Sequence, residues 1–227
     1  KTLTSTAGRA INVDCADVVT IENLTIAGAT GCERGINIIN KAGTTNLKKV
    51  NVSGISYYAV HVATSAGAAQ VNIENSNLTG WAAVAAYGEN GTINVKNSNL
   101  VGINNYTGTS NNFATIAAAS NIAVNVTGGK VTAESFEGKG NQYIVCGDKT
   151  GNVTEGASFT LDTELELKGT AEYANIDLDK NTVTVREEYG TNYVTTPAGN
   201  GLVKLTGASE AEVDGVKYAK LDAAFAA

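Results

Sequence analysis

Short runs that alternate apolar and polar residues follow one another along most of this chain, separated by turns rich in Gly, Asn and Ser. β-Branched residues dominate the apolar positions, which favours strands over helices. No amphipathic pattern of helical period and helix length occurs before residue 218. The alternation therefore predicts an all-β fold built from many very short strands.

One stretch of ten residues is written twice. VNIENSNLTG at residues 71–80 returns as INVKNSNLVG at residues 93–102, with six identical positions and an offset of 22 residues. The triplet that opens this motif recurs at residues 19–21, 50–52, 71–73, 93–95, 124–126 and, in weaker form, 159–161. A second triplet lies between these, at residues 11–13, 36–38, 60–62 and 84–86. Self-similarity of this kind is the signature of repeat architectures.

A single unit of this length cannot bury its apolar side alone, whereas stacked units bury it in a shared core. The sequence therefore predicts a right-handed parallel β-helix (β-solenoid) of about six coils over residues 1–168. The alternative is a β-sandwich or barrel of antiparallel hairpins, which would not require identical residues at a fixed step.

Stacking gives the repeated Asn residues a structural role. A coil of 22 residues sets each Asn of the first copy over its counterpart in the second, which gives the expected ladder pairs Asn72–Asn94, Asn75–Asn97 and Asn77–Asn99. Stacked Asn side chains hydrogen-bond along the pile. The change from Glu74 to Lys96 sets opposite charges over each other, where like charges would repel.

Insertions lengthen some of the units. Residues 27–35, 103–114 and 134–142 are polar segments that we expect to bulge from the coils. In solenoids such insertions collect on one face, which is often the binding face.

The composition changes in the last third of the chain. Residues 1–160 carry ten acidic and ten basic side chains, whereas residues 161–227 carry twelve acidic and six basic ones, which accounts for the net charge of −6. We therefore expect a boundary at residue 168 and an acidic, β-rich segment over residues 169–227. In it, residues 176–185 read as a hairpin, residues 213–216 as a turn, and the alanine-rich end as the start of a helix.

Two family resemblances follow from these patterns. The coils over residues 8–168 resemble the pectate-lyase-like right-handed β-helix superfamily, which includes polysaccharide lyases, glycoside hydrolases, phage tailspikes and non-enzymatic bacterial adhesins. The ending EVDGVKYAKLDAAFAA, residues 212–227, resembles the segment V-x-G-x-x-Y-A-T-L-x-E-A that opens β-helix modules in large surface proteins of gut bacteria. Val213, Gly215, Tyr218, Ala219, Leu221 and Ala224 match, while Lys220 and Asp222 depart from the pattern. The second resemblance implies a secreted or cell-surface protein in which another module follows.

The outward positions of the coils carry little catalytic chemistry. A polysaccharide lyase needs a base together with Ca²⁺ ligands or cations, and a glycoside hydrolase needs a pair of nearby carboxylates. The outward residues of the two triplets are mostly Asn and Thr, with no acidic pair. We therefore predict no catalytic residue, no cofactor and no metal site. The candidate binding residues are the aromatic side chains and the one histidine near the coils, Tyr57, Tyr58, His61, Trp81, Tyr87 and Tyr106.

Each of the two most distinctive candidates has a structural alternative. His61 is either the base of a lyase or a polar side chain in a row of Asn residues. Trp81 is either a platform for stacking a sugar, with Tyr57 or Tyr87, or the cover of a coil corner. Cys15, Cys32 and Cys146 belong to no C-x-x-C pair, so we expect small buried thiols, with a Cys15–Cys32 disulfide as the alternative.

The favoured hypothesis is a non-catalytic, adhesin-like bacterial repeat protein, extracellular or on the cell surface, that acts as a stalk or as a glycan- or protein-binding surface. Its expected partners are glycans, host or bacterial surface proteins, and neighbouring modules of the same chain. The alternative is a polysaccharide lyase or glycoside hydrolase that uses His61, Tyr58, Arg9, Arg34 and Glu33. The acidic, aromatic-poor chain argues against nucleic acid as a partner. We expect no membrane insertion, since no apolar run approaches 18 residues.

Overall fold

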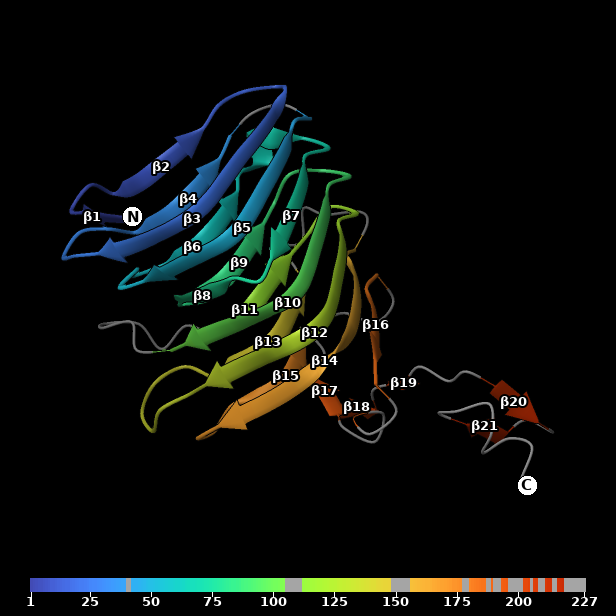
Figure 1. Ribbon diagram of the computed structural model, residues 1–227. Helices are drawn as coiled ribbons and strands as arrows, with labels where there is room; N and C mark the ends of the chain where they lie inside the picture. The colour runs from blue at the N-terminus through green and yellow to red at the C-terminus, as the bar shows by residue number, and fades with distance from the viewer. Residues whose placement is uncertain are drawn as a thin grey trace.

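The computed structural model describes residues 1–39, 42–104, 112–147, 156–176, 180–186 and 189, together with the backbone of the short strands β17 to β21. Two long sheets, here called sheet A and sheet B, contain nearly all of its strands (Figure 1). One short 3₁₀ helix, η1 (Thr64–Ala66), lies in sequence between the strands Tyr58–Val62 and Gln70–Glu74. Among the described residues no helix has the length and hydropathy required to span a membrane.

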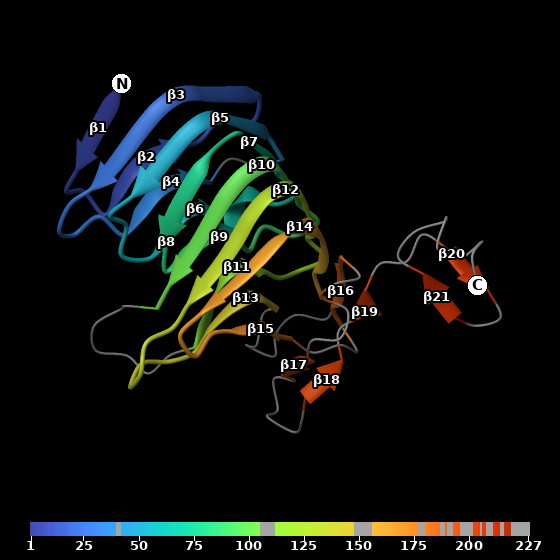
Figure 2. The same cartoon turned by 60° about the horizontal axis from the view of Figure 1, so that its bottom comes forward.

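Sheet A has ten strands, most of them parallel neighbours in a stack that Figure 2 shows from its side. They are β1 (Thr2–Ser5), β3 (Val18–Gly28), β5 (Thr44–Ser53), β7 (Gln70–Glu74), β8 (Asn77–Gly80), β10 (Thr92–Ile103), β12 (Ala123–Glu134), β14 (Ser158–Lys168), β16 (Thr182–Val185) and β19 (Thr206–Gly207).

Sheet B has nine strands and is parallel as far as β17, after which β18 pairs antiparallel. They are β2 (Arg9–Val13), β4 (Arg34–Ile38), β6 (Tyr58–Val62), β9 (Ala82–Ala86), β11 (Phe113–Ala118), β13 (Gln142–Gly147), β15 (Glu172–Asn175), β17 (Tyr193–Thr195) and β18 (Leu202–Lys204). Each coil contributes to sheet A and then to sheet B, so the predicted parallel β-solenoid is confirmed.

The core lies between the two sheets, where inward residues of successive coils stack in rows. One row in sheet A is Ile21, Leu47, Ile73, Val95, Val126, Leu161 and Val185. Another is Ile26, Val52, Leu78, Leu100, Val131 and Leu165. Most of these side chains are completely buried, and each such aliphatic chain contributes about 1.5–3 kcal/mol relative to exposure.

The register corrects one repeat that the sequence pattern assigned wrongly. The triplet 50–52 does not stack on 71–73; residues 45–47 do, with Thr45 beside Val71. Thr45 is fully buried at an inward position where the other coils have apolar residues. Because its side chain is polar, the apolar pattern of the sequence did not indicate that residues 45–47 belong to the repeat. The coil steps in sheet A are therefore 26, 26, 22, 31 and 35 residues from Val19 to Phe159.

The central residues of the repeated ten-residue motif have separate structural roles. In the second copy Asn97 adopts the left-handed conformation with φ of 48°, and its counterparts Asn23, Lys49 and Asn75 do the same at 53°, 52° and 51°. These residues bend each coil between the two halves of its sheet A segment. Asn tolerates this conformation better than most residues do.

The serine after that bend faces the core and satisfies backbone groups. Ser98 accepts a hydrogen bond from the Ser76 amide at 3.0 Å, and Ser76 accepts one from the Val50 amide at 3.0 Å. Both serines are 1% exposed. A buried N–H left without a partner would be costly, so this serine row is what permits the tight bend.

Asn ladders run along the outside of sheet A. Asn72 donates to Asn46 at 2.8 Å, Asn94 donates to Asn72 at 3.0 Å, and Asn125 donates to Asn94 at 3.0 Å. A second ladder joins Asn51, Asn77 and Asn99 through bonds of 2.7 and 2.9 Å. The expected side-chain bond between Asn75 and Asn97 is absent from the described hydrogen bonds. These two residues hold the bend instead.

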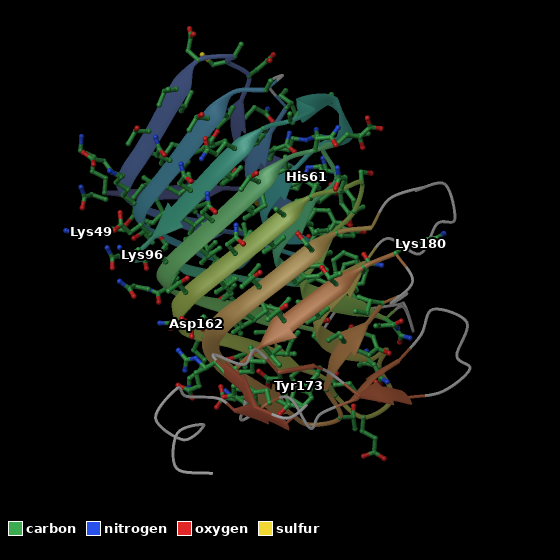
Figure 3. The ribbon with its side chains drawn as sticks, turned by 90° about the vertical axis from the view of Figure 1, so that its right-hand side faces the viewer. Lys49, His61, Lys96, Asp162, Tyr173 and Lys180 are labelled. Carbon is green, nitrogen blue, oxygen red and sulfur yellow. The ribbon has the colours of Figure 1, made fainter. Side chains whose placement is uncertain are left out.

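Charged residues next to the bend alternate in sign from coil to coil. Glu22, Lys48, Glu74 and Lys96 are register neighbours in that order. No ion pair within 4.0 Å joins any two of them among the described residues, so the row stabilises through proximity in solvent rather than through contact. Figure 3 shows Lys49, Lys96 and Asp162 along one edge of the ribbon, away from His61.

The C-terminal region differs in part from the expectation. β15 and β16 extend the two sheets in parallel beyond residue 168, so the expected hairpin over residues 176–185 is wrong: β16 pairs with β14. The boundary at residue 168 stays a prediction. β20 (Ala211–Val213) and β21 (Val216–Tyr218) pair antiparallel, and residues 214 and 215 of the expected turn lie outside the described residues. Lys217 and Tyr218, expected to begin a helix, lie in β21, and residues 219–227 lie outside the described residues.

Small residues line the corner where each coil passes from sheet A to sheet B. A Cβ added to Gly102 would lie 2.3 Å from Thr115 Oγ1 and 2.4 Å from the amide nitrogen of Gln142. That Gln142 amide donates to the Trp81 carbonyl oxygen at 2.6 Å, two coils back. Because Gly102 has no side chain, it leaves the space through which the Gln142 side chain reaches the Trp81 carbonyl and links three coils.

We expect Gly102→Ala to lower the free energy of unfolding by about 1–3 kcal/mol, because the methyl group must displace two buried side chains. Gly8→Ala is the matched control, since nothing lies within 4 Å of an added Cβ there. Urea denaturation of both variants gives the comparison. Equal stability of the two would contradict the packing described for this corner.

The role of Asn97 in the bend is open to a similar test. Asn97→Gly should change the free energy of unfolding by less than about 1 kcal/mol, whereas Asn97→Val should lower it by about 1–2 kcal/mol because a β-branched residue is strained at positive φ. Thermal and urea unfolding measure both. If glycine were as damaging as valine, the Asn97 side chain would have the ladder role that the sequence suggested.

Candidate functional site

Two outward rows on sheet B bring the candidate residues together. The first row is Arg9, Arg34, Tyr58, Ala82, Ala114, Tyr143 and Glu172. The second is Asn12, Asn37, His61, Ala85, Ala117, Cys146 and Asn175. The rows lie three residues apart along each strand. Because parallel strands are about 4.8 Å apart, each step along a row is one coil.

An apolar cluster separate from the core lies on this face. Its floor consists of Ala82, Ala85, Ala114 and Ala117, all at most 2% exposed, and Tyr58, Tyr87 and Phe113 pack over them. The small alanines let aromatic rings approach the sheet closely. We call the aromatic side chains above this floor, with Tyr57, Trp81 and His61, the aromatic face.

The rings of the aromatic face contact one another. Phe113 stacks on Trp81 at 4.3 Å between centroids and on Tyr58 at 5.7 Å, and Tyr57 meets Trp81 edge-on at 5.8 Å. Tyr57, Tyr58, Tyr87 and Phe113 are half-buried, whereas Trp81 is only 7% exposed. Trp81 follows Gly80 directly at the coil corner, so it covers that corner and supports the exposed rings rather than forming the platform itself.

His61 ends a hydrogen-bonded row that begins at Asn12 and passes through Asn37. Asn37 donates its side-chain amide to Asn12 Oδ1 at 2.8 Å, which leaves Asn37 Oδ1 to accept from His61 Nδ1 at 2.7 Å. The proton of the neutral imidazole is therefore on Nδ1, and Nε2 is an acceptor. The His61 ring stacks on Tyr58 at 5.2 Å, and His61 is 7% exposed.

The surroundings keep His61 uncharged at neutral pH. Burial, followed by the positive charges of Arg34 and Arg9, lowers the pKa of His61 from 6.5 to about 4. Burial raises the pKa of Tyr58, which is hydrogen-bonded to the side chain of Tyr87. The face therefore presents a neutral imidazole and neutral phenols beside two arginines.

A groove borders the aromatic face at the corner between the sheets. It has a volume of about 530 Å³, and its lining includes Gly28, Gly54 and Gly80 from three successive coils, with Cys32 and Ile103 at its sides. A Cβ on Gly28 would lie 2.4 Å from the Gly54 carbonyl oxygen, which is why glycine recurs here. Tyr57 and Trp81 directly follow the lining residues Ser56 and Gly80, so the backbone of the groove continues into the aromatic face, although no ring of that face lines the groove.

The three insertions connect the two sheets at the same side of the coils, and residues 105–111 of the second lie outside the described residues. Each one connects a strand of sheet A to the following strand of sheet B: β3 to β4, β10 to β11, and β12 to β13. This placement agrees with the expectation that they gather on one side of the solenoid. Tyr106, a sequence candidate in the insertion after β10, lies outside the described residues.

Catalytic groups are sparse on this face. Glu172 is the one acidic residue in the strands of sheet B that the structure describes. It lies four coil steps from His61, about 19 Å, and five from Glu33, about 24 Å. No group of three or more His, Cys, Asp or Glu side chains is placed to hold a metal in the described parts of the chain. All three cysteines are described, and none forms a disulfide, so the Cys15–Cys32 alternative is wrong.

Sequence reasoning named Tyr57, Tyr58, His61, Trp81 and Tyr87 as candidates but did not name Phe113 and Tyr143. The missed rings lie in β11 and β13, whose triplets continue the second repeat past residue 86. Their signal is the run of small apolar residues in AAVAA and FATIAA, where alanine occupies outward positions as well as inward ones.

We expect the ¹H NMR signals of the single histidine to titrate with a midpoint near pH 4 rather than near 6.5, because the folded chain disfavours the imidazolium. One histidine makes the assignment unambiguous. A midpoint near 6.5 would contradict the burial described for His61.

The same pKa shift makes stability depend on pH. The unfolded chain binds a proton at His61 below pH 6.5 and the folded chain only below about 4, so the free energy of unfolding should fall as the pH drops between these values. The His61 contribution over that window is about 3 kcal/mol. Urea denaturation of the wild type and His61→Gln at pH 4 and pH 7 isolates it, since the variant should lose this part of the pH dependence.

Comparisons of the chain with protein-family models, with curated proteins and with solved structures found no match. What the aromatic face binds must therefore be argued from its own geometry.

Proposed function

We propose that this solenoid is a non-catalytic carbohydrate-binding module of a secreted or cell-surface bacterial protein, and that the aromatic face is its binding surface. The observation that carries the proposal is the set of half-buried rings, Tyr57, Tyr58, Tyr87 and Phe113, held over an alanine floor beside an open groove. Aromatic rings present an apolar face to the C–H groups of a sugar, and the phenols supply hydrogen bonds at the ring edges.

The position of the rings suits a chain-like ligand. The groove crosses successive coils at the corner, and Tyr57 and Trp81 directly follow its lining residues in sequence. A concave surface beside aromatic side chains with a few polar groups suits a ligand that extends over several coils. The resemblance of residues 212–227 to a module-opening segment supports a repeated surface protein, and the adhesin-like members of the pectate-lyase-like superfamily offer a precedent.

The second candidate is a polysaccharide lyase, and one observation favours it. Arg9, Arg34, Tyr58 and His61 share one face, so a base, a proton donor and two cations lie within a few coils. A base with a pKa near 4 is weak at neutral pH, and the buried His61 ring offers little access to a sugar carbon. Hydrolysis by two carboxylates would need them within about 10 Å, which Glu33 and Glu172 do not meet.

A glycan array with the purified chain, run beside depolymerisation assays on uronate polymers, tests the proposal. We expect binding without turnover. Phe113→Ala should weaken binding about tenfold, since it removes the ring that joins Trp81 to Tyr58. Phe136→Ala is the matched control, because Phe136 is 42% exposed and makes none of the described ring contacts.

Turnover that His61→Gln abolishes would replace the binding proposal with the lyase. Binding that both phenylalanine variants retain in full would move the ligand site away from the aromatic face. Circular dichroism of each variant verifies that the sheets are intact.

A further inference from the structure

Two arginines lie directly over each other at the start of sheet B. Arg9 and Arg34 are register partners on the outward side of β2 and β4, so their backbones are one coil step apart, about 4.8 Å. Arg9 is exposed and Arg34 half-buried. Like charges set opposite each other in a sheet are destabilising, and elsewhere this chain alternates the signs of stacked charges.

Nothing described neutralises this pair. Among the described residues, neither Arg9 nor Arg34 makes an ion pair within 4.0 Å, whereas Arg186, which directly follows β16, pairs with Asp162 at 2.8 Å. Glu33 is next to Arg34 in sequence but makes no such pair. Two arginines in register, with no carboxylate paired to either, form a site that an anionic oxygen group can bridge with hydrogen bonds from both guanidinium groups.

Groups suited to a sugar surround the arginine pair. The Arg34 guanidinium lies 5.8 Å from the Tyr58 ring centroid, so the cation borders the aromatic face. On the neighbouring row, Asn12 uses its Oδ1 for Asn37 and keeps its Nδ2 as a donor at the exposed end. Two cations and an exposed amide donor thus lie beside the aromatic face in the first three coils of sheet B.

We infer that the first three coils of sheet B form a subsite for an acidic sugar, in which Arg9 and Arg34 bind a carboxylate or sulfate group at the border of the aromatic face. The inference rests on the proposed carbohydrate-binding function and names the chemical class of its ligand. The chain as a whole is acidic, with a net charge of −6, so attraction of an anion to this place is a local property of the arginine pair.

Isothermal titration with three oligosaccharides of similar length tests the subsite: one of uronic acids, the same one after reduction of its carboxyl groups, and a neutral backbone carrying sulfate esters. We expect the wild type to bind an acidic form at least tenfold more tightly than the carboxyl-reduced form. Arg9→Gln and Arg34→Gln should each remove most of that preference, and added salt should weaken acidic binding more than neutral binding.

Arg186→Gln is the matched control, because it removes the same charge from the residue after β16 and should leave the preference unchanged. A preference for the sulfated form keeps the subsite and identifies sulfate as the bound group. Equal affinity for acidic and carboxyl-reduced forms would overturn this inference while the carbohydrate proposal stands. Binding of none of the three would overturn both, and an acidic preference that survives Arg9→Gln/Arg34→Gln would place the anion elsewhere.

Discussion

Parallel stacking at a single spacing is the constraint on which the rest of this structure depends. Each strand residue lies about 4.8 Å from its register partner in the next coil. A side chain therefore fits only if it can pack against an identical or a chemically similar side chain at that distance. Aliphatic chains, amides and glycine meet this condition, and they form the core rows, the ladders and the coil corner. Charges meet it only by alternation, as Glu22, Lys48, Glu74 and Lys96 do.

This constraint explains why so much of the fold could be predicted from the sequence. Where a residue must match its register partners in the coils on either side, the requirement produces a repeat in the sequence. The two sheets and the contacts Asn72–Asn94 and Asn77–Asn99 could therefore be predicted from the spacing of the repeat alone. The failures occur where a position obeys a different requirement. Thr45 is polar in an inward row, and Asn97 is selected for backbone conformation rather than for its amide. β16 extends a sheet although its flanking residues resemble a hairpin turn.

The candidate site was harder to predict because its residues come from different coils rather than from one continuous segment of the chain. Its rings and arginines are 24 to 32 residues apart in sequence between adjacent coils, and only the register shows that they share a face. A localised binding site also requires a departure from the repeat, since a row of identical residues offers a ligand the same contacts at every coil. On sheet B the first row changes from arginine to tyrosine to alanine within four coils, and this change of chemistry marks the region as different from the uniform Asn rows of sheet A.

The ladders also have a direction. In all seven described Asn–Asn bonds the later residue donates its amide nitrogen and the earlier residue accepts through its oxygen. The side-chain dipoles consequently add along the solenoid axis, as peptide dipoles add along a helix, and each bond polarises the next. Each ladder therefore has an electrically positive end at its earliest residue. On sheet B that residue is Asn12, in the same strand as Arg9, so this row reinforces the attraction of the arginine pair for negative charge.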